Sequence, residues 1–209
     1  NINSFDFSLM LIISLLCLIL LSLKSNFELN LVMLSIENSN LSVDDIYFFL
    51  ENPHAVKLNS LLRKKIILSY ERAQKIAKNT KPVYGINTGF GPLCTKRITS
   101  KETKSLQRNL LLSHSVGVGD PINPELARIM LLCKIKSLSM GFSGVSIELI
   151  ERLIYFFQNN LTPHVPEKGS VGASGDLAPL AHLFLPLIGE GFFWDGEEKV
   201  ESKKILKKH

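Results

Sequence analysis

The sequence predicts a mainly α protein with one short β-hairpin near its C-terminal end. Three observations support this fold class. Apolar residues recur at helical spacing along much of the chain after residue 42. Residues that typically cap helices stand before several of these stretches. The Asp195-Gly196 pair, which is typical of hairpin turns, lies inside the segment 192–200.

The first predicted helix begins at a capping box. Ser42 and Asp45 have the spacing at which each side chain can bond the other residue's backbone N–H. This helix is expected to run through Leu50 and to end at Asn52-Pro53, because a residue before proline disfavours the helical conformation. A longer helix is predicted over 58–77, where apolar positions follow the helical period and Lys and Arg occupy the other face.

A glycine-rich segment follows this helix. Residues 84–93 contain three glycines and a proline, which predicts a mobile loop. A second capping box, Thr99 with Glu102, comes next. It begins a helix that is expected to reach about Val116.

Two consecutive helices are predicted after that. Asn123-Pro124-Glu125 combines a cap residue, a proline at the first helical position and an acid in the first turn. This helix is expected to run to about Met140, where Gly141 ends it. Ser146 begins the next helix, which extends to about Asn159.

The last predicted helix runs from about Gly175 to Ile188, and the hairpin at 192–200 follows it. The helices between 106 and 188 are rich in Leu and Ile on more than one face, which predicts deep burial or contact between subunits. The chain has 209 residues, of which 45% are hydrophobic and 21% charged. This composition suits one globular domain with a sizeable core.

The segment 169–182, GSVGASGDLAPLAH, carries the most specific chemistry in the chain. At its centre, Ala173-Ser174-Gly175 can form a ring from its own backbone. Gly175 has no Cβ, so its nitrogen can approach the Ala173 carbonyl carbon, and the Ser174 hydroxyl is a leaving group. The product is a methylidene-imidazolone, an electrophile that no ordinary side chain provides. Asp176 begins a helix directly afterwards, and a helix N-terminus favours the negative charge that such an electrophile accepts.

This segment closely resembles the motif of the aromatic amino-acid ammonia-lyases, whose prosthetic group is 4-methylidene-imidazole-5-one (MIO). Three further blocks match the same family in its order and at about its spacing. They are YGINTGFGPL at 84–93, LQRNLLLSHSVGVGDP at 106–121 and KIKSLSMGFSGV at 134–145. The resemblance covers roughly Met33 to His209, and it is strongest to the histidine-specific members of the family.

The resemblance implies roles for individual residues. MIO would form from Ala173, Ser174 and Gly175. Tyr84 matches the family's catalytic base, which removes the β-proton of the substrate. His114 matches the position that selects the substrate side chain, and a histidine there suits an imidazole ring. Without the resemblance, a lone Tyr or His in such a place would be interpreted as a packing residue.

Two further assignments compete with simpler interpretations. Asn87 is expected to contact the substrate, although an Asn in a glycine-rich loop also caps or turns the chain locally. Asp176 is expected to support ring formation, although an acid in the first turn is typical of any helix.

The family resemblance implies non-oxidative deamination of L-histidine to trans-urocanate and ammonia, as in histidine degradation. It also implies a bundle of long helices in a homotetramer, with MIO as cofactor and neither a metal nor a diffusible cofactor. One alternative is a phenylalanine or tyrosine ammonia-lyase or aminomutase, which Ser113-His114 and a panel of substrates would discriminate. Another is an inactive truncated remnant or a membrane-tethered interaction protein.

Composition argues against other classes of function. The formal net charge is +5, but no basic stripe is interleaved with aromatic residues, so nucleic-acid binding is not expected. Three cysteines, Cys17, Cys94 and Cys133, match neither a disulfide framework nor a zinc spacing, which favours a reducing cytoplasm. The remaining histidines have no metal-ligand spacing and are expected to be structural or exposed. They are His54, His164, His182 and His209.

The N-terminus differs from the rest of the chain. Residues 7–23 carry no charge and are mostly Leu and Ile, at the lower limit for a membrane span. Asp6 stands where a signal peptide carries basic residues. We interpret residues 1–32 as sequence translated upstream of a start at Met33, with a membrane anchor as the alternative. Residues 33–209 are expected to form the MIO-bearing N-terminal part of an ammonia-lyase domain that stops within a Lys-rich helical pattern and is inactive alone.

Overall fold

A computed structural model describes residues 41–93, 95–170 and 177–209. Residues 1–40, Cys94 and residues 171–176 lie outside the described part of the chain. The predicted ring-forming triplet and Asp176 are therefore among the residues that the structure does not describe.

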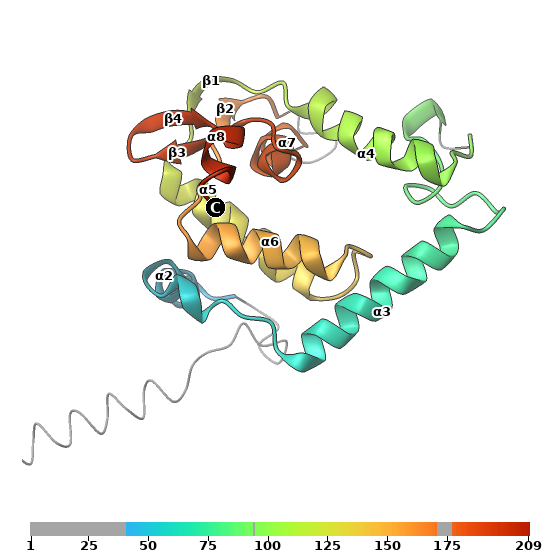
Figure 1. Ribbon diagram of the computed structural model, residues 1–209, viewed down its shortest axis with the longest axis horizontal. Coiled ribbons are helices and arrows are strands. Elements are labelled where there is room, and N and C mark those ends of the chain that lie inside the picture. The colour runs from blue at the N-terminus through green and yellow to red at the C-terminus, as the bar shows by residue number, and fades with distance from the viewer. Residues whose placement is uncertain (1–40, 94, 171–176) are drawn as a thin grey trace, which may run out of the picture. The chain divides into compact units, whose positions relative to one another are not determined.

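Helices dominate the described residues, so the predicted mainly α fold class is confirmed (Figure 1). The helices are α2 (Val43–Glu51), α3 (Ser60–Ala77), α4 (Ser100–His114), α5 (Pro124–Ser139), α6 (Ile147–Gln158), α7 (Leu177–Phe184) and α8 (Ser202–Leu206). Short 3-10 turns are η1 (Pro53–Ala55), η2 (Gly91–Leu93) and η3 (Leu185–Ile188). Within the described ranges, no helix has both the length and the apolar content that crossing a membrane requires.

Helices α5 and α6 form the centre of the core. They pack side by side, and α2 and α3 contact α5 (Figure 1). The side chains of these two central helices that have no exposed surface are Ala127, Leu131, Leu132, Ile135, Ile150, Leu153 and Phe156. Leu131 and Leu132 are neighbours and both are buried, so a wide face of α5 is covered, and deep burial is confirmed for this helix. The ring of Phe156 meets that of Phe193 edge-on with centroids 5.2 Å apart, which joins the helices to the C-terminal hairpin.

Both predicted capping boxes are present. The Ser42 side chain accepts a bond from the Asp45 N–H, and the Asp45 carboxylate accepts one from the Ser42 N–H at 2.9 Å. Thr99 and Glu102 repeat this arrangement at 2.8 Å. Because the bonds favour the ionised carboxylates, they lower the pKa of Asp45 and of Glu102. They also fix where α2 and α4 begin.

The predicted C-terminal hairpin is confirmed. It consists of β3 (Phe192–Asp195) and β4 (Glu198–Glu201), which are antiparallel. Asp195 pairs with Glu198, which leaves Gly196-Glu197 as a two-residue turn.

A second antiparallel pair joins β1 (Val118–Pro121) to β2 (Pro166–Lys168). The sequence does not predict it. Both strands are three or four residues long and mostly exposed, so neither shows the apolar alternation from which a strand is recognised. This sheet brings the segment after α4 next to the segment that precedes α7.

Two predicted helix ends differ from the structure. The helix expected to reach Ile188 changes from α to 3-10 geometry after Phe184, because Pro186 has no N–H to donate and its ring crowds the preceding turn. Helix α4 ends at His114 rather than at about Val116, and Ser115 caps it by donating its N–H to the Leu111 carbonyl. The earlier end makes His114 the last residue of its helix.

Candidate active site

The loop at 84–93 presents Tyr84 to solvent. Tyr84 is 62% exposed, and its ring meets that of Phe90 edge-on with centroids 5.6 Å apart. The base of the loop is closed by an antiparallel bridge between Thr88 and Arg97. The Tyr84 phenol is therefore accessible to a ligand while the loop that carries it is tied down.

The side chain of Asn87 holds this loop to the end of α3. Asn87 is 1% exposed, and its Oδ1 accepts a hydrogen bond from the Val83 N–H at 2.7 Å. Its Nδ2 donates to the carbonyl oxygens of Ile76, Asn79 and Lys81 at 3.1 to 3.4 Å. With both ends of the amide bonded to backbone, the geometry favours a structural role for Asn87 over direct contact with substrate.

The imidazole of His114 is oriented by its own helix. Its Nδ1 lies 2.8 Å from the Leu110 carbonyl oxygen, one turn earlier, and 3.1 Å from the Ser113 hydroxyl. A carbonyl only accepts, so this contact requires a proton on Nδ1 and leaves a lone pair on Nε2. Among the described residues Nε2 has no hydrogen-bond partner. The His114 side chain is half-buried, and in the neutral ring its Nε2 can accept a hydrogen bond from a ligand.

The segments on either side of residues 171–176 lie near α4 or the link that follows it. Gly169 and Ser170 precede residue 171, and Leu177 begins α7 directly after residue 176. Helix α7 packs against α4 and against β2. The structure thus brings α4, the helix that ends at His114, next to the helix that follows residues 171–176. No hydrogen bond or ring contact joins Tyr84 to His114 in the part of the chain that the structure describes.

One contact beside the candidate site is not predicted by the sequence. The Nε2 of His182, on α7, accepts a hydrogen bond from the Gly117 N–H at 2.9 Å. Burial lowers the pKa of His182, and the positive charge of Lys199 lowers it further. The two partners are 65 positions apart, and no local pattern pairs residues at that separation.

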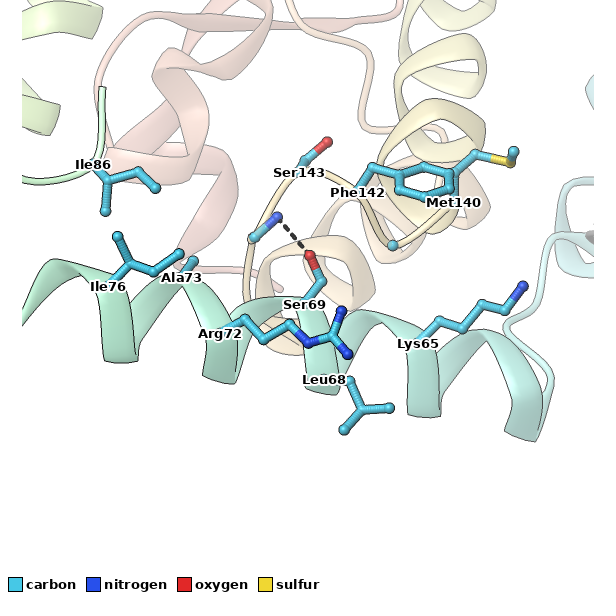
Figure 2. Close-up of a pocket in the computed structure, with 12 residues that line it drawn as sticks. Lys65, Leu68, Ser69, Arg72, Ala73, Ile76, Ile86, Met140, Phe142 and Ser143 are labelled. Atoms are coloured by element: carbon cyan, nitrogen blue, oxygen red, sulfur yellow. Dashed lines mark hydrogen bonds between the residues drawn. The ribbon is translucent and has the colours of Figure 1, made fainter. Parts of the chain in front are cut away.

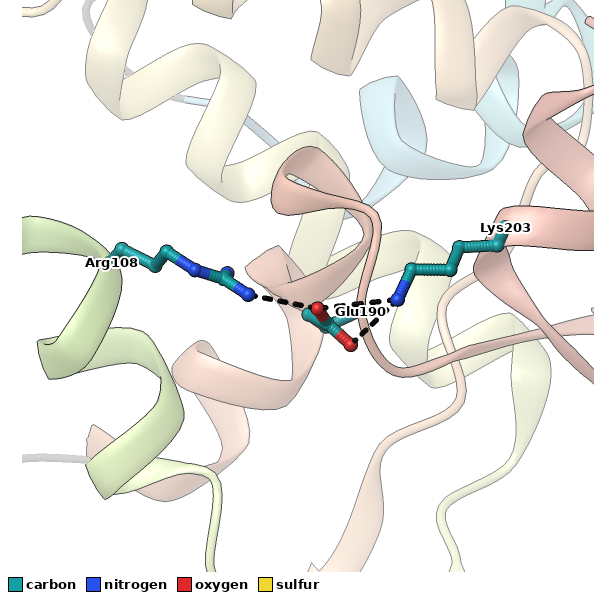
Figure 3. A network of polar contacts seen from close by, with 3 residues as sticks. All are labelled: Arg108, Glu190 and Lys203. Carbon is teal, nitrogen blue, oxygen red and sulfur yellow. Dashed lines mark hydrogen bonds and ion pairs between the residues drawn. The ribbon is translucent and has the colours of Figure 1, made fainter. Parts of the chain in front are cut away.

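A polar network holds the middle of α4 to the C-terminal segments (Figure 3). The Arg108 Nη2 lies 2.9 Å from Glu190 Oε1, and the Lys203 Nζ approaches the same oxygen at 3.4 Å. The hydrogen bond from Arg108, followed by the charge of Lys203, lowers the pKa of Glu190. These side chains are partly exposed, so the ion pairs connect α4 to the C-terminal segments but contribute little to stability.

A pocket of about 520 Å³ lies between α3 and the turn after α5 (Figure 2). Its lining combines apolar side chains with the cations Lys65 and Arg72, and Phe142 at its edge is 85% exposed. The Ser69 hydroxyl accepts a hydrogen bond from the Gly144 N–H at 3.1 Å across it. None of the described residues assigned to catalysis or substrate lines this pocket. Ile86, from the loop that carries Tyr84, is part of the lining, so the pocket adjoins that loop.

The helical core, the accessible loop tyrosine and the oriented histidine at the end of α4 are the features that the resemblance to the ammonia-lyases leads us to expect. Over residues 41–209 the chain matches the family described as aromatic amino acid lyase. The chain therefore belongs to the aromatic amino acid lyase family. This confirms the family predicted from the four sequence blocks.

Similar proteins include members with different activities. The chain is 40% identical over 173 residues to a histidine ammonia-lyase from Caldanaerobacter subterraneus, which covers 83% of this chain and 34% of that relative. The crystal structure of histidine ammonia-lyase from Trypanosoma cruzi has a TM-score of 0.70 at 31% identity, over 80% of this chain and 32% of that one. Tyrosine aminomutase from Streptomyces globisporus has a TM-score of 0.73 at 32% identity, over 81% and 32%. The chain spans about a third of the length of the curated relatives it matches.

Proposed function

We propose that the protein deaminates L-histidine to trans-urocanate and ammonia. The observation that carries this proposal is the 40% identity to histidine ammonia-lyase over most of this chain, with an Ala-Ser-Gly triplet inside the matched region. The oriented imidazole of His114 supports histidine over an apolar aromatic substrate.

Ala173, Ser174 and Gly175 would supply the electrophile, although the structure does not describe them. Ring closure forms a bond from the Gly175 nitrogen to the Ala173 carbonyl carbon. The Ala173 oxygen leaves as water with the amide protons of Ser174 and Gly175. The Ser174 hydroxyl leaves as a second water with the proton of its own Cα. This balance needs no oxidant, metal or diffusible cofactor.

The residues around the triplet fit such a group chemically. Small residues dominate 169–175, and an acid followed by a helix comes directly after them. The finished ring supplies an electrophile that makes the substrate amine a better leaving group. We propose that Asp176 supports ring closure, with a role only as an acid near a helix N-terminus as the alternative.

Tyr84 is proposed to take the β-proton of the substrate. Its exposure supports this role, because the phenol oxygen can reach a ligand without moving a neighbouring side chain. His114 is proposed to seat the substrate imidazole by accepting its N–H at Nε2. Asn87 is proposed to act through the loop, by holding the backbone that carries Tyr84.

Three broader proposals follow from the same resemblance. The protein works as a homotetramer, as the family resemblance implies. It is cytoplasmic, which the dispersed cysteines support. Residues 33–209 correspond to the MIO-bearing part of a lyase domain, which the family match from residue 41 onward supports, and residues 1–32 do not belong to that domain.

The test is a substrate panel on protein expressed from the complete open reading frame. L-Histidine, L-tyrosine and L-phenylalanine are compared by following the conjugated acids that they yield. We expect turnover with histidine, and a loss of at least about 10³-fold in Ser174→Ala, as for removal of a covalent catalytic group. Ser170→Ala, in the same segment, is the control and should keep wild-type turnover. Normal turnover by Ser174→Ala would contradict the proposal.

A further inference from the structure

The hydrogen bond between His182 and Gly117 connects two segments that matter for the proposed chemistry. Gly117 lies three residues after His114, in the link between α4 and β1. His182 lies on α7, which begins directly after residue 176. The 2.9 Å bond therefore joins the segment following the selectivity residue to the helix following the triplet.

The backbone around this bond is packed without spare room. A Cβ on Gly117 would lie 2.9 Å from His182 Nε2 and 3.1 Å from the Pro166 Cβ. Gly169 has a φ of +147°, and a Cβ there would lie 3.0 Å from Gly117 Cα and 3.1 Å from the Ala178 Cβ. Three segments thus meet at this point. They can approach so closely because Gly117 and Gly169 have no side chains.

Ala178 and His182 are four positions apart, so they lie on the same face of α7. Both face the glycines, Ala178 by contact with Gly169 and His182 by its bond to Gly117. The segment that ends at residue 170 and helix α7, which begins after residue 176, are consequently both held against Gly117. Residues 171–176 themselves are not part of this contact.

The imidazole of His182 can accept this hydrogen bond only if Nε2 carries a lone pair, because the Gly117 N–H is the donor. The neutral ring then carries its proton on Nδ1. Burial and the nearby charge of Lys199 both lower the pKa of His182, which favours the neutral ring at neutral pH.

We infer that His182 is a positioning residue, which fixes both ends of the ring-forming segment against the link after His114. The inference rests on the proposed function, because it assumes that Ala173-Ser174-Gly175 closes to a ring. His182 does not touch the substrate in this account. It holds α7 at a fixed distance from Gly117. Ring closure and the orientation of His114 both require that the two segments stay in this position.

The test compares three variants of protein expressed from the complete open reading frame. His182→Gln places an amide oxygen near the position of Nε2 and can still accept the Gly117 N–H. His182→Leu has a similar size and cannot accept. His164→Gln is the control, because it removes another imidazole with a lowered pKa, one whose ring lies against Trp194 and not against these glycines. Ring content is measured as the loss of two waters from the peptide containing 173–175, and turnover is measured separately.

We expect His182→Leu to lower ring content and kcat at least about tenfold at an equal folded fraction, as expected when a buried donor loses its partner. His182→Gln and His164→Gln should stay within about threefold of wild type by both measures. Wild-type ring content in a folded His182→Leu protein would overturn the inference.

If His182→Leu does not fold, His182→Asn replaces it. The Asn side chain is too short for its amide to reach the Gly117 N–H. Ring content in the His182→Asn protein should therefore fall well below that in the His182→Gln protein. Equal ring content in these two variants would overturn the inference. Failure of the proposed function looks different, because the wild-type protein would then contain no ring at all.

Discussion

The Nδ1 atom of His114 lies 2.8 Å from the carbonyl oxygen of Leu110, one helical turn earlier. This bond turns the ring and fixes its tautomer, so that Nε2 is the atom offered to a ligand. A substrate imidazole N–H can satisfy that acceptor, whereas a phenyl ring cannot.

His114→Leu should therefore lower kcat/KM for L-histidine by about 10- to 100-fold, the range expected for losing a specific hydrogen bond to substrate. The preference for L-phenylalanine relative to L-histidine should rise, because the new side chain is apolar. Steady-state kinetics with both substrates measures this. Leu112→Ala, at an exposed position of the same helix, is the control and should change neither value. An unchanged histidine-to-phenylalanine ratio in His114→Leu would exclude a selectivity role.

Asn87→Ala should destabilise the loop that carries Tyr84. Loss of the amide leaves the partly buried Val83 N–H without its acceptor and the Asn79 and Lys81 carbonyls without this donor, at a cost of about 1–3 kcal/mol. Hydrogen exchange in the peptide spanning 79–90 should accelerate, and the free energy of unfolding should fall. Asn79→Ala, which removes an exposed amide nearby, should have little effect. A raised KM with unchanged stability and exchange would instead support contact between Asn87 and the substrate.

Leu131→Ala tests the core of α5. Leu131 has no exposed surface, so the substitution leaves a cavity and should lower the free energy of unfolding by about 2–5 kcal/mol. Leu126→Ala, on the same helix but 49% exposed, should cost much less. Urea unfolding of both variants gives the comparison. A similar decrease in the free energy of unfolding in both variants would mean that α5 is not packed as described.

Protonation of two histidines should make stability depend on pH. Burial, with a further contribution from Lys199, lowers the pKa of both His164 and His182 below 6.5. In the unfolded chain these side chains bind protons near pH 6.5, while in the folded chain they resist protonation. The free energy of unfolding should therefore be fully retained above that pH and should fall as the pH drops from about 6.5 towards the lower folded values.

The measurement is urea unfolding at several pH values between about 7.5 and 5, above the range where most carboxylates titrate. A protein with both histidines replaced by Gln should show a flatter profile in this window. If the free energy of unfolding of this double variant fell with pH as steeply as that of the wild type, other groups would be responsible for the pH dependence.

The local parts of this structure could be predicted and the non-local parts could not. The capping boxes at Ser42 and Thr99 and the turn at Gly196 depend on residues within a few positions of each other, so the sequence alone predicts them. The pairing of β1 with β2 and the bond from Gly117 to His182 join distant segments through short, exposed or glycine-rich stretches. Such stretches carry no periodic pattern, so their partners emerge only once the helices have packed.

The candidate site likewise has parts that the sequence predicts and parts that it does not. The four sequence blocks identify the family and name Tyr84 and His114, because the residue types stand in a recognisable order. The burial of Asn87 beneath backbone carbonyls depends on how the loop folds back onto α3, and no pattern in the loop specifies it.

The central claim is that this chain makes its own electrophile, and mass spectrometry of the peptide spanning 169–182 tests it most directly. For protein expressed from the complete open reading frame, the account predicts a peptide lighter by two water molecules at Ala173-Ser174-Gly175, and the unmodified mass in Ser174→Ala apart from the substitution itself. An unmodified wild-type peptide, in protein that nevertheless turns over L-histidine, would contradict it.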